Sequence, residues 1–163
     1  MNAPLLAIGP APLDLPALVA AVTSRGAETG TDGAIASFIG VVRNHNVGRR
    51  VSHLEYEAYE PLALRSFERI STEIAARWPG VRLALHHRIG RIDIGKASVV
   101  IAAASAHRGH ACAACRYAIE RVKQISPIWK REFFEGGDVW IEGATADPDD
   151  AQALADAERV ACA

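Results

Sequence analysis

The chain has 163 residues, half of them hydrophobic, and a formal net charge of −1 at pH 7. This length and composition suit one compact unit whose core is large enough to fold without disulfide bonds. The near-neutral charge argues against general binding to nucleic acids or membranes. The sequence has no internal repeat or low-complexity linker, so we expect a single domain over residues 1–163.

The N-terminal segment, residues 1–22, is apolar but matches neither a signal peptide nor a transmembrane helix. It has no basic start, carries Asp14 and is interrupted by four prolines, and no apolar run reaches the roughly 18 residues that a membrane span needs. The three cysteines, Cys112, Cys115 and Cys162, are an odd number, and two of them fall in a helical pattern. We therefore expect a reduced, cytoplasmic protein.

Hydrophobic patterning predicts two strands and a long helix between residues 33 and 78. The run 33–42 is apolar and rich in β-branched residues after a Gly-Thr-Asp-Gly turn signal, which predicts a buried strand. A polar loop over 43–50 and a second strand over 51–59 should follow. A helix that starts at Pro61 is then expected, because an apolar stripe recurs at helical spacing: Ala63, Phe67, Ile70, Ile74 and Trp78.

The second half of the chain is predicted to contain four strands and two helices. Residues 81–89 alternate between apolar and polar side chains, with His87 on the inner face. In chain order, the expected elements are the strand 81–89, a turn-rich stretch 90–95, the apolar strand 97–104, a helix from near Ser105–Arg108 to Ile125, the strands 128–134 and 139–142, and a peripheral C-terminal helix or tail over 147–163 that Asp147-Pro148-Asp149 would cap. This order predicts the α+β class, a sheet with helices packed on it.

Charge is distributed unevenly along the chain. Between Ser105 and Arg131 there are six basic residues and one acid, whereas seven acids and one arginine follow from Asp138 to the end. A basic segment of this length suits a small anionic ligand better than a long polyanion.

Lysine is rare in this sequence, with 15 arginines but only three lysines, Lys96, Lys123 and Lys130. A lysine amine can lose its proton, and its pKa falls on burial or beside other cations, whereas a guanidinium stays charged. Lys123 and Lys130 lie in the basic segment, which makes them candidates for chemistry. Their spacing alone also fits two solvated surface lysines, one of them near a helix C-terminus.

The string Ser105-Ala-His-Arg108 lies between an apolar strand and a helix. Free backbone N–H groups at a helix start attract anions, and His107 and Arg108 would strengthen that attraction. Arg43, at the end of another strand, could converge on the same place, because ligand sites gather at strand ends and helix starts. An ordinary polar surface turn fits the same residues.

The spacing His107-x-x-His110 followed by Cys112-x-x-Cys115 raises a zinc or thiol-dependent alternative. A redox cysteine pair normally begins at a helix N-terminus, and a structural zinc site usually draws ligand pairs from two separate segments. Here both cysteines fall inside the predicted helix, and the sequence has no second pair. We therefore expect the cysteines to be small packing side chains and the protein to hold no metal.

Four strings of the chain, in order, resemble the MoaE family, the large subunits of molybdopterin synthase. They are Phe38-x-Gly-x-Val-Arg43-Asn-His-Asn46, His87-Arg-Ile-Gly90, Ser105-Ala-His-Arg108, and Lys123-x6-Lys130 within Lys123-Gln-Ile-Ser-Pro-Ile-Trp-Lys-Arg-Glu132. The likeness is collinear from about Gly33 to Glu142. It favours a chemical role for the two lysines over solvated surface positions.

The resemblance implies an α/β hammerhead fold with an additional antiparallel strand subdomain. It implies a cytoplasmic sulfurtransferase without a cofactor, arranged as a homodimer of large subunits within a heterotetramer. A small ubiquitin-like subunit would insert a C-terminal Gly-Gly tail, whose thiocarboxylate supplies sulfur to cyclic pyranopterin monophosphate; two transfers form the dithiolene of molybdopterin. By position, Lys123 and Lys130 would be catalytic, and Arg43, His107 and Arg108 would bind the substrate.

Two positions depart from the family's pattern. Cys112 stands where an aromatic residue is usual, which would either reshape a pocket wall or be simple core variation. Ala144 stands where some members have an arginine that reaches the neighbouring subunit's site, so the resemblance does not carry that phosphate contact over to this chain.

Overall fold

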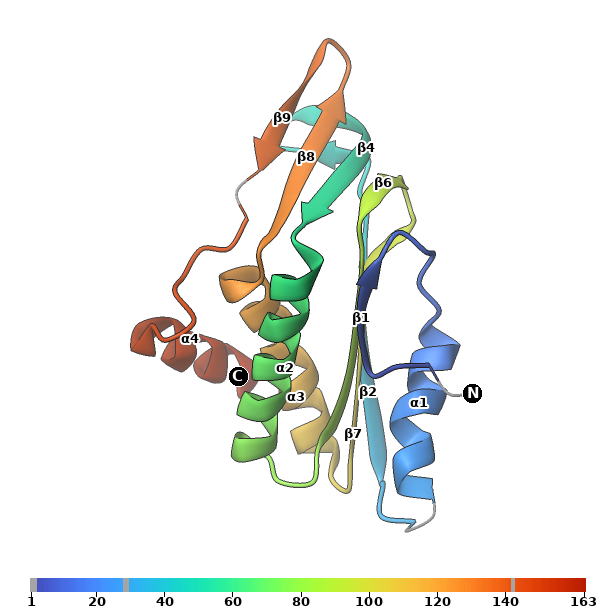
Figure 1. Cartoon of the computed structure of the whole chain (residues 1–163), viewed down its shortest axis with the longest axis vertical. Helices are drawn as coiled ribbons and strands as arrows, with labels where there is room; N and C mark the ends of the chain where they lie inside the picture. The colour runs from blue at the N-terminus through green and yellow to red at the C-terminus, as the bar shows by residue number, and fades with distance from the viewer. Residues whose placement is uncertain (1–2, 28–29, 142) are drawn as a thin grey trace.

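The computed structural model describes residues 3–27, 30–141 and 143–163, which form two β-sheets and four helices (Figure 1). The elements in chain order are β1 (Leu6–Gly9), α1 (Leu15–Ala27), β2 (Ala34–Val41), β3 (His45–Asn46), β4 (Arg49–Ala58), α2 (Glu60–Arg77), β5 (Arg82–Arg88), β6 (Gly90–Asp93), β7 (Ala97–Ser105), α3 (Arg108–Ile125), β8 (Ile128–Phe134), β9 (Gly137–Ile141) and α4 (Ala151–Ala161). None of the described helices is long and apolar enough to cross a membrane.

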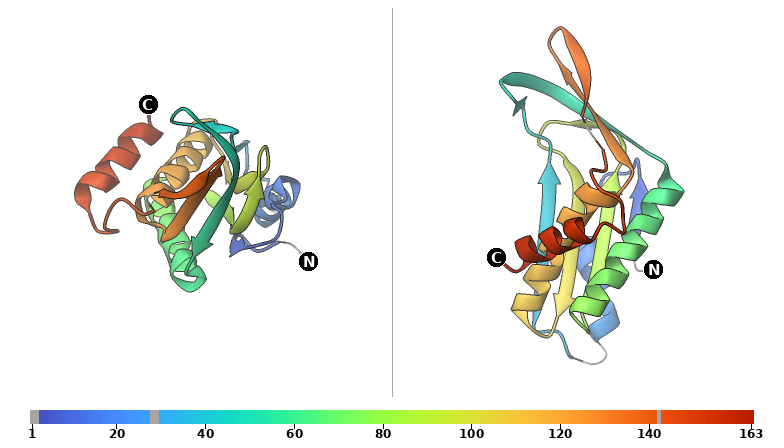
Figure 2. Two further views of the ribbon diagram at one scale, coloured as in Figure 1. Left: turned by 90° about the horizontal axis from the view of Figure 1, so that it is seen from above. Right: turned by 90° about the vertical axis from the view of Figure 1, so that its left-hand side faces the viewer.

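The first sheet has the strand order β1-β5-β7-β2 and is covered by helices on both faces. β1 pairs parallel with β5, and the other pairings are antiparallel. Helices α2 and α3 lie on one face and α1 lies on the other (Figures 1 and 2). The strand β7 is therefore buried on both sides: Ile101 and Ala103 belong to the core under α2 and α3, whereas Val100 and Ala102 pack with α1. Burial on both faces explains why its sequence is a continuous apolar run.

The second sheet stands at one end of the first and carries part of the candidate site (Figure 1). Its strands run in the order β3-β4-β8-β9, β6 also pairs with β4, and all of these pairings are antiparallel. In the β4–β8 register Tyr56 lies opposite Lys130, so strand pairing fixes the positions of both residues. A separate small apolar core consists of Val42, Val51, Leu54 and Ile92.

Helix α4 packs against α3 through a face of small residues. Ala153, Ala157 and Ala161 recur every four residues and are buried. Asp150 caps the helix, because its carboxylate accepts hydrogen bonds from the backbone N–H groups of Gln152 and Ala153 at 2.8 and 3.1 Å.

The structure confirms the predicted α+β class. It differs in three places from the helices and strands that the hydrophobic pattern predicts. Local patterning predicts no element in residues 1–22, yet β1 and the start of α1 lie there. Two short strands, β3 and β6, occupy the predicted loop 43–50 and the turn-rich stretch 90–95, and both are held by pairing with β4. The last helix begins after Asp150, so the cap predicted at Asp147-Pro148-Asp149 is wrong by one residue.

Glu73 joins α2 to α3 through a buried ion pair. Its carboxylate accepts hydrogen bonds from Nε and Nη2 of Arg121, both at 2.9 Å, and from the Tyr117 hydroxyl at 2.8 Å. Arg121 is fully buried, so its charge depends on this partner. Burial acts to raise the pKa of Glu73, but the hydrogen bonds from Arg121, Tyr117 and Arg69 outweigh burial and lower that pKa.

We expect Glu73→Gln to lower the free energy of unfolding by about 3 kcal/mol, because Arg121 would keep a buried charge without its carboxylate. Since the folded-state pKa of Glu73 is lowered, this contribution is present above the unfolded-state pKa and is lost as pH falls through the folded value. Urea unfolding at neutral and acidic pH measures both effects. Glu158→Gln is the matched control, because its pair with Arg77 is half exposed and should contribute less than about 1 kcal/mol. Equal losses in the two variants would contradict this account.

Candidate functional site

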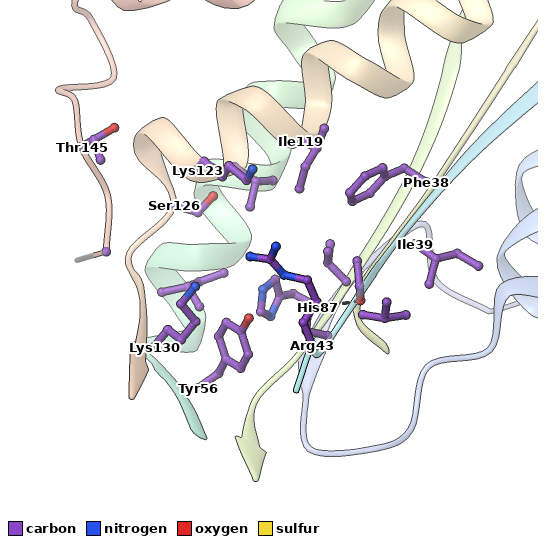
Figure 3. A pocket seen from close by; sticks show the side chains of 17 residues that line it. Phe38, Ile39, Arg43, Tyr56, His87, Ile119, Lys123, Ser126, Lys130 and Thr145 are labelled. Atoms are coloured by element: carbon purple, nitrogen blue, oxygen red, sulfur yellow. Dashed lines mark hydrogen bonds between the residues drawn. The ribbon is translucent and has the colours of Figure 1, made fainter. Parts of the chain in front are cut away.

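A pocket of ≈ 610 Å³ opens where the second sheet meets α3 and the edge strand β2 (Figure 3). Its cationic residues come from three separate places: Arg43 follows β2, Lys123 lies in the last turn of α3, and Lys130 lies on β8. The structure therefore brings together three of the predicted site residues. Apolar side chains complete much of the wall: Phe38, Ile39, Val99, Ile119, Val122 and Ile128.

The side chains of Arg43, Lys123 and Lys130 point toward one another across this pocket (Figure 3). Burial lowers the pKa of the Lys130 amine, and the charges of Lys123 and Arg43 lower it further, while Glu132 acts in the opposite direction. A lysine with a lowered pKa exchanges its proton more readily near neutral pH. Lys130 is thus suited to proton transfer, and Arg43 supplies a fixed positive charge.

The turn between α3 and β8 fixes the two lysines relative to each other. Ser126 ends the helix with a backbone hydrogen bond of 3.1 Å to the preceding turn, and Pro127 prevents its continuation. The buried Ser126 hydroxyl also shares a hydrogen bond of 2.7 Å with the hydroxyl of Ser66 on α2. Lys123 and Lys130 therefore lie on either side of a turn that buried hydrogen bonds hold in place.

Glu132 ties the loop that carries Arg43 to the strand that carries Lys130. Its buried carboxylate accepts hydrogen bonds from Nδ2 of Asn46 at 2.8 Å and from Nε and Nη2 of Arg49 at 3.2 and 3.1 Å. Asn46 and Arg49 belong to the β3–β4 hairpin, which follows Arg43 closely along the chain. The strings Val-Arg-Asn-His-Asn and Trp-Lys-Arg-Glu therefore meet in space at this carboxylate.

The sequence did not indicate the uncharged polar wall of the pocket, which Tyr56, His87 and Ser98 form. Burial lowers the pKa of His87 to about 4, so its imidazole is neutral at pH 7. Burial also raises the pKa of the Tyr56 hydroxyl, which keeps it protonated. In the sequence His87 occupies an inward-facing position of an alternating strand, a pattern typical of core. Two signals pointed beyond packing: a histidine stands in that apolar row, and His87 opens one of the four strings that resemble the family.

His107 and Arg108 lie at the opposite end of α3 from Lys123. Both are exposed, and they line a separate depression of ≈ 440 Å³ beside Gly33. Fifteen helical positions separate Arg108 from Lys123, which corresponds to about 22 Å at 1.5 Å per residue. Within one chain, therefore, these two residues do not converge with Arg43 on one anion site.

The geometry gives little support to the zinc or thiol alternative built on His107, His110, Cys112 and Cys115. Cys112 is exposed, so the prediction that both cysteines are packing side chains is wrong for this one and holds for Cys115. Cys115 stays a thiol at neutral pH, because burial and, secondarily, the charge of Cys112 raise its pKa to about 12. In the described ranges, no three His, Cys, Asp or Glu side chains gather where they could hold a metal ion. The thiols also lie outside the lining of the cationic pocket.

We expect the purified protein to contain no stoichiometric zinc, and the Cys112→Ala/Cys115→Ala variant to lose stability rather than activity. Truncating the buried Cys115 leaves a small cavity in the core, which should cost about 1 kcal/mol, whereas the exposed Cys112 should contribute little. Elemental analysis and thermal unfolding measure the two effects, with the exposed Cys162→Ala as control. One zinc per chain, lost together with activity in the double variant, would establish the alternative instead.

Comparison with known proteins relates this sequence and its fold to one family. Residues 8–125 match the family model of the MoaE protein. The chain is 54% identical to the molybdopterin synthase catalytic subunit of Bacillus subtilis, over 67% of this chain and 69% of that protein.

Two solved structures show the same fold. The molybdopterin synthase structure from Staphylococcus aureus matches with a TM-score of 0.72 and 38% identity, over 83% of this chain and 95% of that one. The MoaE protein of Burkholderia ambifaria matches with a TM-score of 0.74 and 34% identity, over 93% and 95% of the two chains. These likenesses confirm the fold that the sequence predicts. On sequence and on architecture, this chain belongs to the MoaE family.

Proposed function

We propose that this chain is the sulfur-transferring subunit of a molybdopterin synthase and that the pocket of Arg43, Lys123 and Lys130 is its active site. The sulfur donor is the thiocarboxylated C-terminal Gly-Gly tail of a small ubiquitin-like subunit, and the acceptor is cyclic pyranopterin monophosphate. One observation carries the proposal: three cations from separate elements converge on one pocket, and both reactants are anions. Membership of the MoaE family and the name of the Bacillus subtilis relative, a catalytic subunit, support it.

In each transfer the donor sulfur forms a C–S bond to a carbon of the pterin side chain and a C–O bond of that carbon breaks; the displaced oxygen leaves as water from one carbon and stays on the phosphate, as the cyclic ester opens, at the other. Water then attacks the acyl carbon, the acyl C–S bond breaks, and the tail is left with a carboxylate. Two donors therefore supply one dithiolene. Lys123 lies at the acyl end of the tail, where it polarises the acyl group and takes part in proton transfer, and Lys130, with its lowered pKa, shares that proton transfer. Arg43 holds the phosphate through charge-assisted hydrogen bonds.

The proposal includes a second copy of the chain, paired along β2. This strand forms an edge of the first sheet, and Ile35, Ile39 and Val41 are exposed along it. A long apolar edge is a template for pairing with another strand. Two copies that pair β2 with β2 antiparallel about a two-fold axis form the homodimer at the centre of a heterotetramer with two small subunits.

Antiparallel pairing of this kind gives His107 and Arg108 a role in the pocket. Both lie near the start of β2, where Gly33 donates its backbone N–H to the carbonyl of Ser105 at 3.0 Å, whereas the pocket lies at the end of β2. In an antiparallel pair the start of one strand lies beside the end of the other. His107 and Arg108 of the second copy then approach the pocket of the first, so that each active site takes residues from both copies.

Mixing two inactive variants tests whether the sites are shared. Lys123→Ala and His107→Ala/Arg108→Ala should each lose activity alone. After subunit exchange half of the dimers are mixed and each has one intact site, so about a quarter of the wild-type activity should return. The control mixture of Lys123→Ala with Lys130→Ala should recover nothing, because both residues belong to one copy's pocket. Failure of the first mixture to recover would contradict shared sites.

The function itself is tested by incubating the wild-type chain with a thiocarboxylated small subunit and cyclic pyranopterin monophosphate, and by detecting the dithiolene. Substrate binding without any product would favour a non-catalytic binding module of the same fold. Product that depends on added zinc or on Cys112 would favour the thiol or zinc alternative.

We place the reaction in the cytoplasm, which the three free cysteines support.

A further inference from the structure

His87 is a polar side chain of the pocket to which the reaction scheme assigns no role. It lies near the end of β5, is 6% exposed, and lines the same pocket as the three cations. Its ring packs edge-on against Tyr56, with the ring centroids 5.1 Å apart and an interplanar angle of 69°. Strand and ring contacts thus hold the imidazole in one orientation.

The hydrogen bonding of His87 fixes its tautomer. Nδ1 lies 2.8 Å from the backbone carbonyl oxygen of Arg88, and a carbonyl can only accept, so Nδ1 carries the proton. Burial lowers the pKa of the ring to about 4, so the imidazole carries no second proton at neutral pH. Nε2 is therefore a bare acceptor, and it has no hydrogen-bond partner among residues 3–27, 30–141 and 143–163. Nε2 is not among the buried atoms of these residues that lack a partner, so it keeps access to the pocket, where a donor of a ligand can bind it.

The pocket has two walls of different chemistry. Arg43, Lys123 and Lys130 supply positive charge, which suits a phosphate or a thiocarboxylate. His87 and Tyr56 lie side by side near the Arg43 side chain and carry no charge (Figure 3). A neutral acceptor repels the lone pairs of an anion but binds an N–H group. The substrate of the proposed function has both parts, since a pterin ring presents amide and amino N–H groups and its other end carries a phosphate.

We propose that His87 determines substrate specificity by accepting, at Nε2, a hydrogen bond from an N–H group of the pterin ring. The ring then lies against the wall of His87 and Tyr56, and the phosphate lies against the cations. This inference rests on the proposed function and adds to it the residue that recognises the heterocycle. Sites that hydrogen-bond a buried polar group discriminate strongly against ligands that lack it, because the site's own group is then left unpaired.

Binding of two probes to the full chain separates recognition of the ring from recognition of the anion. His87→Leu should bind cyclic pyranopterin monophosphate about 10- to 100-fold more weakly than wild type, while inorganic phosphate binds unchanged. His87→Gln, which keeps an acceptor, should recover most of the loss. The matched control is His86→Leu, because His86 is the adjacent strand residue, and its Nε2 lies instead 2.7 Å from the carbonyl oxygen of Pro4. Wild-type affinity of His87→Leu for the pterin, or an equal loss for both probes, would overturn the inference.

A measurement on the wild-type protein does not depend on how the variants fold. With ¹⁵N-labelled histidine, the Nε2 resonance of His87 should shift when the pterin binds and should stay unchanged with inorganic phosphate. A pterin complex that leaves this resonance in place refutes the role of His87 and leaves the proposed function standing. If the wild-type chain binds no pterin at all, both the proposed function and this inference fail.

Discussion

Replacing Lys123 with alanine should reduce dithiolene formation by at least about 100-fold, and replacing it with arginine should be nearly as damaging. Alanine removes both the charge and the proton that the acyl group would meet. Arginine restores the charge, but a guanidinium keeps its proton near neutral pH and so cannot take part in proton transfer. Both variants should fold normally, because the Lys123 side chain is exposed in the last turn of α3.

Single-turnover assays with saturating thiocarboxylated small subunit measure this effect apart from partner binding. Lys96→Arg is the matched control, since it makes the same chemical change at an exposed lysine outside the pocket lining. We expect that control to retain full activity. Near-wild-type turnover by Lys123→Arg would mean that only charge is needed at this position, and the proton-transfer role would be wrong.

Removing the last two residues of the small subunit should abolish product formation altogether. The lining of the pocket contains no cysteine: the Cys115 thiol is held protonated by burial, and the exposed Cys112 and Cys162 lie outside the lining, so we expect the sulfur to come from the small subunit. A Gly-Gly end suits a narrow channel, because no side chain obstructs it and the backbone can approach closely. The thiocarboxylate charge would be drawn by Lys123 and Lys130.

Calorimetric titration of the large subunit with full-length and truncated small subunits tests the docking step, and product analysis tests transfer. Binding of the full-length form should weaken modestly as salt is raised, because the site is partly shielded. A full-length small subunit with a carboxylate end in place of the thiocarboxylate is the control: it should bind but give no product. If the large subunit alone makes dithiolene from inorganic sulfide as fast as the reconstituted pair, this account of the sulfur source does not hold.

The amino-acid sequence predicts those parts of the fold and site that local patterns encode. The apolar stripe of α2 indicates a helix with one buried face, and the continuous apolar run of β7 indicates a strand buried on both faces. The scarcity of lysine singled out Lys123 and Lys130, and the structure places both in one pocket with Arg43. The resemblance, rather than spacing, decided that these lysines have a chemical role.

The remaining features depend on contacts between distant segments. β3 and β6 are short and exist through pairing with β4, so their own residues carry no strand pattern. Tyr56 and His87 share a strand face with the apolar residues two positions away, as core residues do, and only the packing of two sheets shows that they face a cavity. The motifs that contain His107 and Lys123 follow one another along the chain, but they lie at opposite ends of α3. The 18 residues of this helix hold the two side chains far apart.

The buried carboxylate of Glu132 couples the effects of mutations in the segment that carries Arg43 to those in the strand that carries Lys130. Asn46 and Arg49 reach it from the hairpin, so a change at any of these three positions alters the surroundings of the other two. Epistasis between residues 43–50 and 128–134 follows, although some 80 residues of chain separate them. A chimaera between family members would therefore need to exchange both segments together. Directed evolution of this pocket would need to mutate both segments in the same library.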